Sequence, residues 1–341
     1  MTVAQKKLSQ GKLPANILKR LLKRYATESK SVVVGPAVGI DCAVIDFHGQ
    51  YLLAKTDPIT FVAEDIGLYA LHINANDIAV MGGVPRWFLA TVLLPEGSAT
   101  EEAAERIFSQ ISRACKSLGV TLSGGHTEIT RGIEMPIIVG QMLGEAKKGR
   151  LVTTAGARPG DAVILTKGIA IEGTSIIARK KGESLVKKGV FSKRFIARCK
   201  NLVKTPGISV MEDAKTAMKN ASVHAMHDPT EGGLATGLHE LATAACCGVL
   251  VYEDSIAVLP ESRKICDHFG LDPLSLIASG ALVAAIDPRD TDKALKGLKK
   301  AGINAAQIGV VTEKSRGVVI SGKSGERALP YPERDEITKI F

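Results

Sequence analysis

The stretch NANDIAVMGG, residues 74–83, places the carboxylate of Asp77 near the end of an apolar helix. The predicted helix begins at Asp65 as its N-cap, runs to about Met81 and stops at Gly82-Gly83, just ahead of Pro85. Four other short acidic segments are spread along the chain. They are GIDCAV at residues 39–44, KTDP at 55–58, GGHTE at 124–128 and DPTEGG at 228–233. Each sets an acidic side chain beside small or turn-forming residues.

Four of these acids, Asp41, Asp57, Asp77 and Asp228, are candidate magnesium ligands. Magnesium binds a few protein oxygens and completes its shell with water and phosphate oxygens, so dispersed aspartates suit a metal-nucleotide site. If the four converge in one cleft, they repel one another unless divalent cations neutralise them. Taken singly, each could be a turn residue, a surface acid or a helix cap. Their joint occurrence favours a site for metal and phosphate.

The segment GGHTE supplies the candidate catalytic pair, His126 and Glu128. Gly124 and Gly125 before them allow the backbone to approach a ligand closely, so the pair could orient a phosphate or transfer a proton. The alternative is that the two side chains only bind one another. We interpret a further histidine, His227, as structural.

A second glycine-bearing stretch, residues 166–175, joins a predicted strand to a predicted helix. Backbone amides at the start of that helix could hold a phosphate, and the side chain of Lys167 beside Gly168 would add a positive charge. Lys167 and Gly168 are therefore candidate nucleotide contacts. Glycines in loops before helices are common, so this signal is weaker than the acidic segments.

The pattern of helices and strands predicts two domains of mixed α/β layers, an α+β fold. With 341 residues, 45% of them hydrophobic, the chain can fill two cores. Residues 149–158 are polar and contain glycine, and the pattern restarts after them, so we divide the chain into residues 1–150 and 151–341. Predicted helices lie at residues 14–30, 65–81, 99–118, 173–180, 210–220, 231–245, 261–269 and 291–301. Predicted strands lie at residues 31–34, 42–47, 51–56, 86–94, 120–123, 135–143, 162–166, 222–226, 248–252, 281–286, 307–311 and 318–320.

Composition excludes several classes of protein. No apolar run approaches the roughly 20 residues of a membrane-spanning helix, and the N-terminus lacks a signal-peptide core, so we expect a cytoplasmic protein with no membrane contact. The six cysteines form no C-x-x-C pair, and most of them are expected to be small buried thiols. The net charge is +9, and residues 179–204 hold ten lysines and arginines. A solvated helical face explains that stretch better than nucleic-acid binding, because aromatic residues make up only 4% of the chain.

Taken in order, the acidic segments resemble those of the PurM superfamily, which includes aminoimidazole ribonucleotide (AIR) synthetase and its relatives. Within it the hydrogenase-maturation HypE group is the most similar. Residues 39–44 resemble its G-D-D-A-A-x element, residues 76–83 its N-D-x-x-M-G element and residues 228–233 its D-x-T-x-G-G element. Residues 271–280 are similar to the L-D-P-L segment before its last sheet strands. The resemblance covers nearly the whole chain.

This resemblance implies an N-terminal domain that forms a homodimer through its sheet, a C-terminal α+β sandwich, and ATP with magnesium as cofactors. The implied reaction activates an acceptor oxygen by phosphoryl transfer, mainly through positioning and charge neutralisation. Asp41, Asp57, Asp77 and Asp228 then hold Mg-ATP, and Asn76 joins the nucleotide site.

Two departures from the HypE pattern leave the acceptor open. HypE ends in a cysteine whose thiol carries the carbamoyl group, whereas no cysteine follows Cys266 in this sequence, and Ile40 replaces one of two adjacent acids. The alternative function is a non-catalytic nucleotide-binding scaffold that serves metalloenzyme maturation together with a partner protein.

Overall fold

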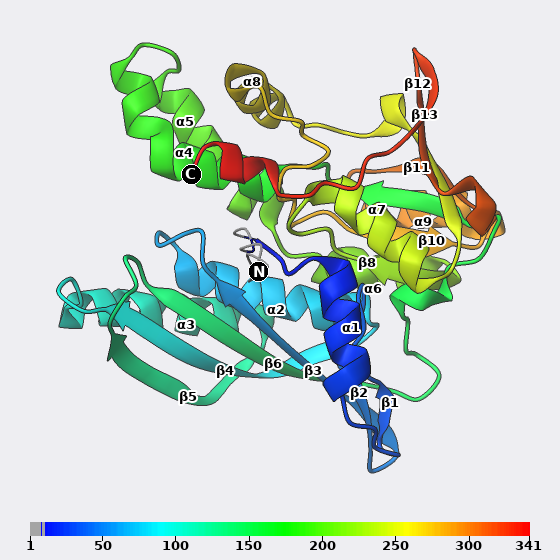
Figure 1. The fold of residues 1–341 in the computed structure, drawn as a ribbon, viewed down its shortest axis with the longest axis horizontal. Coiled ribbons are helices and arrows are strands. Elements are labelled where there is room, and N and C mark those ends of the chain that lie inside the picture. Colours follow the sequence, from blue (N-terminus) through cyan, green and yellow to red (C-terminus); the bar gives the residue numbers. More distant parts are fainter. Residues whose placement is uncertain (1–7, 9–10) are drawn as a thin grey trace, which may run out of the picture.

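The computed structural model describes residue 8 and residues 11–341. The strands in this part of the chain form two separate sheets (Figure 1). The first sheet has the order β1-β2-β3-β6-β4-β5, and all its neighbours are antiparallel except β4 and β5. Its strands are β1 (Val32–Val34), β2 (Ala43–Phe47), β3 (Gln50–Ile59), β4 (Val84–Pro95), β5 (Thr121–Thr130) and β6 (Ile137–Ala146).

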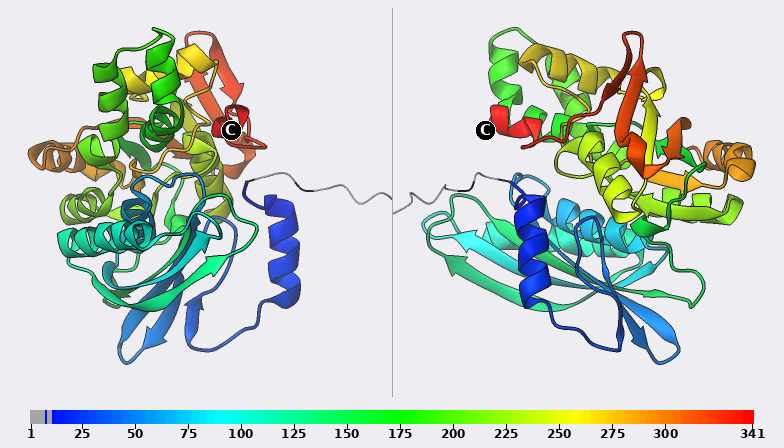
Figure 2. Two further views of the ribbon diagram at one scale, coloured as in Figure 1. Left: turned by 90° about the vertical axis from the view of Figure 1, so that its left-hand side faces the viewer. Right: turned by 45° about the vertical axis from the view of Figure 1, so that its right-hand side comes forward.

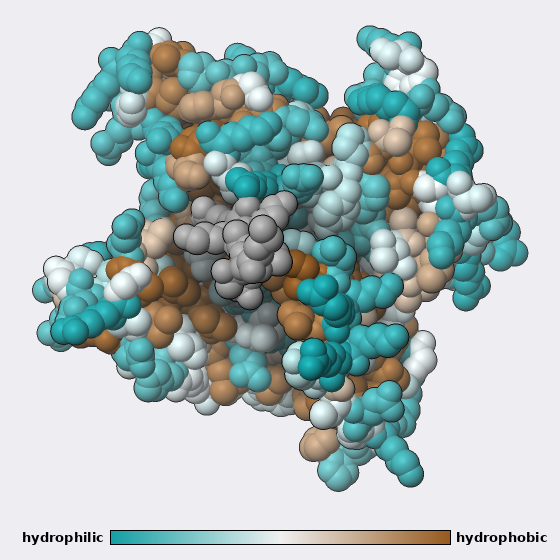
Figure 3. Space-filling view, viewed as in Figure 1, coloured by the Kyte–Doolittle hydropathy of each residue, from teal (hydrophilic) through white to brown (hydrophobic). Residues whose placement is uncertain are grey.

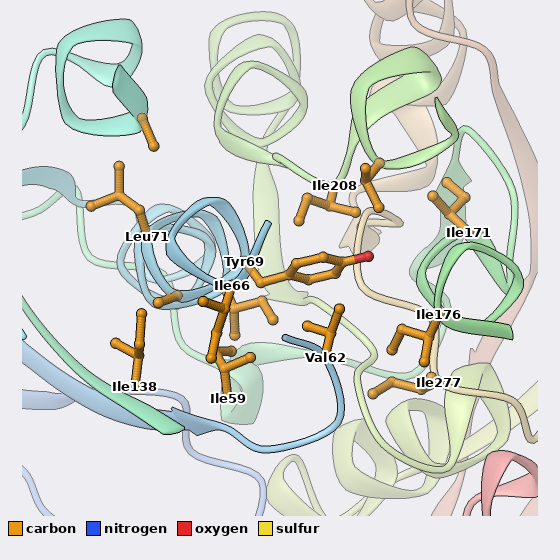
Figure 4. Packing of buried hydrophobic residues seen from close by; sticks show 14 of the residues in the cluster. Ile59, Val62, Ile66, Tyr69, Leu71, Ile138, Ile171, Ile176, Ile208 and Ile277 are labelled. Carbon is orange, nitrogen blue, oxygen red and sulfur yellow. The ribbon is translucent and has the colours of Figure 1, made fainter. Parts of the chain in front are cut away.

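Two helices, α2 (Ile66–Val80) and α3 (Glu101–Leu118), pack on one face of this sheet. Helix α2 is buried on nearly all sides because the sheet lies against one side of it and the second half of the chain against the other. Figure 4 shows Tyr69 of α2 reaching across to Ile208 and Ile176 of the second half. The two halves thus share one hydrophobic core at α2.

The second sheet has the order β13-β12-β9-β11-β7-β10-β8, and only β9 and β12 pair in parallel. Helices α6 and α9 cover one face, and α7 covers the other. Successive residues of β7 point to opposite faces, so the strand contributes side chains to both cores. The strands are β7 (Ala162–Thr166), β8 (Val223–His227), β9 (Gly248–Tyr252), β10 (Val283–Ile286), β11 (Ala305–Thr312), β12 (Val318–Gly322) and β13 (Gly325–Ala328). The helices are α6 (Met211–Asn220), α7 (Gly233–Ala244) and α9 (Thr291–Lys300).

Three more helices, α4 (Ile171–Lys187), α5 (Lys193–Asn201) and α8 (Pro260–Phe269), pack together beside the second sheet. Helix α1 (Ala15–Tyr25) stands apart from both layers in Figure 2, and none of its residues is buried. The predicted mixed α/β class and two-layered organisation are confirmed. The chain leaves the first sheet at Ala146 and enters the second at Ala162; the division near residue 150 stays a prediction.

Several local predictions need correction. The strand expected at residues 120–123 continues through Gly124-Gly125 as β5, and α5 and β13 were not predicted. Asp65 precedes α2 but makes no capping bond: its backbone is left-handed (φ 61°), and its carboxylate accepts a hydrogen bond of 2.7 Å from Arg179. The side chain of Asp65 therefore binds Arg179, which is distant in sequence, instead of capping the helix as the local sequence predicts.

Within the part of the chain that the structure describes, no helix is long and apolar enough to cross a membrane. All six cysteines are free thiols, and five of them are buried, as their composition predicts.

Candidate functional site

Four aspartates from four separate parts of the chain lie near one another, and three of them, Asp41, Asp77 and Asp228, are buried. Asp41 directly precedes β2, Asp57 lies on β3, Asp77 occupies the last turn of α2, and Asp228 directly follows β8. Oxygens of Asp41 and Asp228 and a ring nitrogen of His227 lie within 4.8 Å of one another. We call Asp41, Asp57, Asp77 and Asp228 the acid cluster.

A lysine that the sequence analysis did not single out joins the acid cluster. The ammonium of Lys55 lies 3.5 Å from Asp57 and 3.2 Å from Asp77, and its side chain is 20% exposed. Burial alone lowers the pKa of Lys55, but the charges of Asp77 and Asp57 outweigh it and raise the pKa well above its usual value. Lys55 is therefore a fixed positive charge among the acids.

His227 is a second internal cation. Its Nδ1 lies 3.1 Å from an oxygen of Asp41, and its Nε2 lies 2.9 Å from Glu240. Both ring nitrogens thus donate to carboxylates, which only the imidazolium form can do. Burial opposes this charge, yet Asp41 and Glu240 raise the pKa of His227 well above its usual value. A doubly protonated ring has no lone pair for a metal, so His227 is a counter-ion for Asp41.

Asp228 and Asp77 keep carboxylate oxygens without any hydrogen-bond partner among the described residues. Both oxygens of Asp228, which is 2% exposed, and Oδ2 of Asp77 are in this state. Burial raises the pKa of Asp228 to about 7, and the nearby charge of Asp41 adds to the effect. Burial likewise raises the pKa of Asp77 well above its usual value. Buried oxygens left unpaired are costly, and hard oxygen ligands of this kind fit a magnesium ion.

At the rim of the cluster, Lys12 brings the N-terminal segment into contact with the second half of the chain. Its half-exposed ammonium lies 3.6 Å from Glu240 and donates a hydrogen bond of 3.2 Å to the hydroxyl of Thr230. Glu240, in turn, holds His227. Lys12 therefore connects residues 11–14, just before α1, to the site.

Two of the predicted nucleotide contacts use their side chains for structure. The amide of Asn76 donates to the carbonyl of Ile208 (2.8 Å) and accepts from the amide of Val210 (2.9 Å), so it ties α2 to the second half of the chain. The ammonium of Lys167 lies 3.3 Å from Asp213 and lines a separate cavity of about 1070 Å³ bordered by α5 and α6.

The glycine of that second stretch also has a structural role. Gly168 has φ 131°, and a Cβ there would lie 2.9 Å from the carbonyl of Ala257. It therefore serves close packing of two chain segments rather than a ligand at the acid cluster.

The predicted catalytic pair lies outside the acid cluster of its own chain. His126 and Glu128 are exposed on β5, an edge strand, where they bind one another at 3.1 Å. Gly125 has φ 147°, and a Cβ there would lie 2.0 Å from the carbonyl of Ala90 on β4, whereas Gly124 is unhindered. The diglycine thus allows β5 to pair with β4, and the pair's catalytic role stays a prediction.

The basic stretch at residues 179–204 is less uniform than a solvated face. The side chain of Arg179 is only 5% exposed and binds Asp65, while Lys200 and Arg198 pair with Glu64 and Glu261. These pairings neutralise part of the charge that a nucleic acid would need.

Two of the three site residues that were not predicted, Lys55 and Glu240, had a signal in the sequence. Lys55 stands two positions before Asp57, and residues two apart on a strand share a face. Glu240 is a single acid within the apolar helix pattern of α7, which marks a buried charge that needs a partner. Lys12 follows a glycine, Gly11, in a stretch with no periodic pattern, so only the folded chain reveals its contact.

Comparison with known proteins matches both halves of the chain to one family. The model described as "AIR synthase related protein, N-terminal domain" matches residues 39–146, and its C-terminal counterpart matches residues 158–322. A putative hydrogenase expression/formation protein of Methanocaldococcus jannaschii is 30% identical over 341 residues, covering 97% of each chain. Carbamoyl dehydratase HypE of Rhizobium leguminosarum bv. viciae is 29% identical over 313 residues, covering 89% of this chain and 86% of that protein. A crystal structure of hydrogenase maturation protein HypE in complex with ATP shares the fold, with a TM-score of 0.68, 23% identity, and coverage of 93% of this chain and 91% of that one.

Proposed function

The chain belongs to the AIR synthase-related proteins of the PurM superfamily and is HypE-like, and from this premise we propose that it is an ATP- and magnesium-dependent enzyme. It activates an acceptor oxygen by phosphoryl transfer in the course of metalloenzyme maturation. The observation that carries the proposal is Asp228: it is buried, neither of its oxygens has a partner in the described part of the chain, and one of them lies within 4.8 Å of an oxygen of Asp41, an arrangement that suits a cation. The names of the HypE relatives and the ATP complex of one of them support the choice of nucleotide.

The residues present fit magnesium, and their roles follow from their positions. When bound, Mg-ATP supplies a γ-phosphoryl group whose charge the metal neutralises. Asp228, Asp77 and Asp41 would hold the cation through oxygens that the fold has already withdrawn from water. His227 fixes the orientation of Asp41, and Lys12 offers its half-exposed ammonium to a phosphate oxygen. Such a site works by position and charge, and it needs no covalent intermediate on the protein.

Isothermal titration with a nonhydrolysable ATP analogue tests the proposal. We expect binding that depends on Mg²⁺ and is lost in Asp41→Asn and Asp228→Asn, whereas Asp292→Asn on the exposed side of α9 leaves it unchanged. The reaction is followed as ADP release across acceptors that carry hydroxyl or carbamoyl oxygens. Absence of Mg²⁺-dependent binding by the folded wild type, or equal binding by Asp228→Asn, would contradict the proposed function.

A non-catalytic scaffold is the second candidate, and one observation favours it. Ile40 stands beside Asp41 where the family pattern has an acid, and the ammonium of Lys55 already occupies part of the acid cluster. A scaffold binds the Mg²⁺ nucleotide complex and a maturation partner protein without releasing ADP. Nucleotide binding without turnover in the same assays would therefore select this alternative.

We further propose a homodimer formed through the first sheet. The face of this sheet opposite α2 carries half-buried apolar side chains on β4 and β6, among them Leu89, Leu93 and Val139, and Figure 3 shows hydrophobic residues gathered over these strands. Strand β5 leaves its outer edge unpaired within the described chain, a feature that proteins usually cover. A dimer would cover both, and the exposed pair His126 and Glu128 would then lie near the subunit interface.

Sedimentation analysis tests this dimer. We expect twice the chain mass for the wild type, and the monomer mass for Val139→Asp, because the variant places a charge in the apolar face. The matched control is Ser321→Asp on β12 of the second sheet, which should stay dimeric. A monomeric wild type at micromolar concentration would contradict the proposal.

A further inference from the structure

We propose that the ammonium of Lys55 permanently holds one cation position of the acid cluster, so that the protein itself binds a single divalent cation there. This inference rests on the proposed function, because that function identifies the cluster as a cation site. It adds that a lysine of the chain itself neutralises part of the negative charge that metal ions would otherwise neutralise. It therefore predicts a number, one, that can be counted without any nucleotide.

The position of Lys55 is fixed by the fold. Strand β3 lies inside the first sheet, paired with β2 on one side and β6 on the other, and Lys55 stands opposite Met142 of β6. Its side chain reaches Asp57 at 3.5 Å and Asp77 at 3.2 Å and is mostly shielded from water. The backbone of Lys55 is held by β6, and β2 pairs with β3 up to the preceding residue, Ala54. The ammonium stays between these two carboxylates.

The oxygens that Lys55 leaves unpaired point to one remaining cation position. Asp77 directs Oδ1 at the ammonium, and its Oδ2 has no partner among the described residues. Both oxygens of Asp228 are also unpaired there, and one of them lies within 4.8 Å of an oxygen of Asp41. The ammonium of Lys55 thus leaves these oxygens of Asp77 and Asp228 free for one cation.

The charges lead to the same number. When a divalent cation is bound and all four aspartates are ionised, they carry four negative charges, and Lys55 and His227 supply two positive ones, which leaves two negative charges for the cation to balance. Outside the acid cluster, Glu240 and Lys12 face each other at the rim and cancel, and Glu231 at the same rim also faces Lys12. One divalent cation balances the remainder, and a second would leave an excess of positive charge in a buried place, which is costly.

Counting Mn²⁺, a paramagnetic substitute for Mg²⁺, tests the inference. The wild-type protein without nucleotide is titrated with Mn²⁺, and the free ion is measured by electron paramagnetic resonance. We expect one Mn²⁺ per chain for the wild type and for Lys55→Arg, which keeps the charge, and two for Lys55→Met, which removes it. The matched control is Lys148→Met, which removes an exposed lysine paired with Asp46 at 2.7 Å and should leave the count at one.

The outcomes separate this inference from the proposed function. Two Mn²⁺ per wild-type chain, or one in a folded Lys55→Met protein, would overturn the role of Lys55 while leaving nucleotide binding untouched. No Mn²⁺ at all would overturn the cation site and this inference together. If Lys55→Met does not fold, Lys55→Gln replaces it, since it is neutral but polar, and the wild-type count still decides by itself. Because no nucleotide is present, a failure to bind ATP cannot change any of these results.

Discussion

Replacing Asp228 by asparagine should stabilise the protein when divalent cations are absent. In the folded chain Asp228 is buried, neither oxygen has a partner among the described residues, and its pKa is raised to about 7. An aspartate in an unfolded chain has a pKa of about 3.9. The folded state therefore binds this proton more tightly than the unfolded state does, so stability falls as pH rises from about 4 to about 7. Above that range the full cost of the charge is present.

The size of the effect follows from the same pKa shift. A shift of about three pKa units at about 1.4 kcal/mol each gives an upper bound of about 4 kcal/mol for the ionised side chain at pH 8. Asparagine carries no charge, but its buried amide also lacks partners and costs about 1 to 3 kcal/mol. The net expectation for Asp228→Asn is a gain of about 1 to 3 kcal/mol in the free energy of unfolding.

Urea unfolding at pH 5 and pH 8, with a chelator or with Mg²⁺, measures these terms. With chelator, the variant should be more stable than the wild type at pH 8, and the difference should shrink at pH 5. With Mg²⁺ at about 100 times its dissociation constant, the wild type should gain about 3 kcal/mol and the variant much less. Asp292→Asn controls for the loss of an exposed aspartate. An Asp228→Asn protein that is less stable than the wild type at pH 8 with chelator would refute the reasoning.

Three further substitutions test separate parts of the fold. Gly125→Ala should disrupt the pairing of β5 with β4 and lower the melting temperature, because its Cβ would meet a β4 carbonyl, whereas Gly124→Ala should be near neutral; thermal unfolding compares the two. Arg179→Ala should cost about 2 to 3 kcal/mol in urea unfolding, because Asp65 loses a buried partner, and a cost below about 0.5 kcal/mol would contradict this. Ile337→Ala should cost about 2 to 4 kcal/mol, because this fully buried side chain anchors the C-terminal segment to the core, and rapid hydrogen exchange of that segment in the variant would support the account.

Local sequence was sufficient for most elements of the fold. Strand β7 matches its predicted residues, and helices such as α3 and α9 lie where hydrophobic periodicity placed them. These segments alternate or repeat their apolar residues with the period of one structure, so neighbours in sequence decide their form. Asp65 shows the limit, because a helix-cap preference worth about 1 kcal/mol gave way to an ion pair with a residue more than a hundred positions away.

The aspartates of the acid cluster were identified from the sequence, but the positively charged side chains that pair with them were not. Asp41, Asp57, Asp77 and Asp228 stood in short motifs that could be read one at a time, and the fold brings them together. Lys55 stood in one of those motifs as well, but nothing local shows that its ammonium reaches Asp77 on another element. Whether a lysine is an exposed charge or the counter-ion of a buried acid depends on its neighbours in the fold, and these come from distant segments.

The sequence by itself determined the family, the mixed α/β layers and the set of acids, because each is carried by residues close together in the chain. The tertiary structure decided which acids remain unpaired. Burial at the junction of the two halves leaves the oxygens of Asp228 without a hydrogen-bond partner among the described residues, while Lys55 pairs with Asp77 and His227 with Asp41. It also placed His126 and Glu128 on an exposed edge, because β5 continues past the diglycine at which the predicted strand ended. Pairing, burial and charge balance depend on the whole fold, and for that reason only the folded chain could settle them.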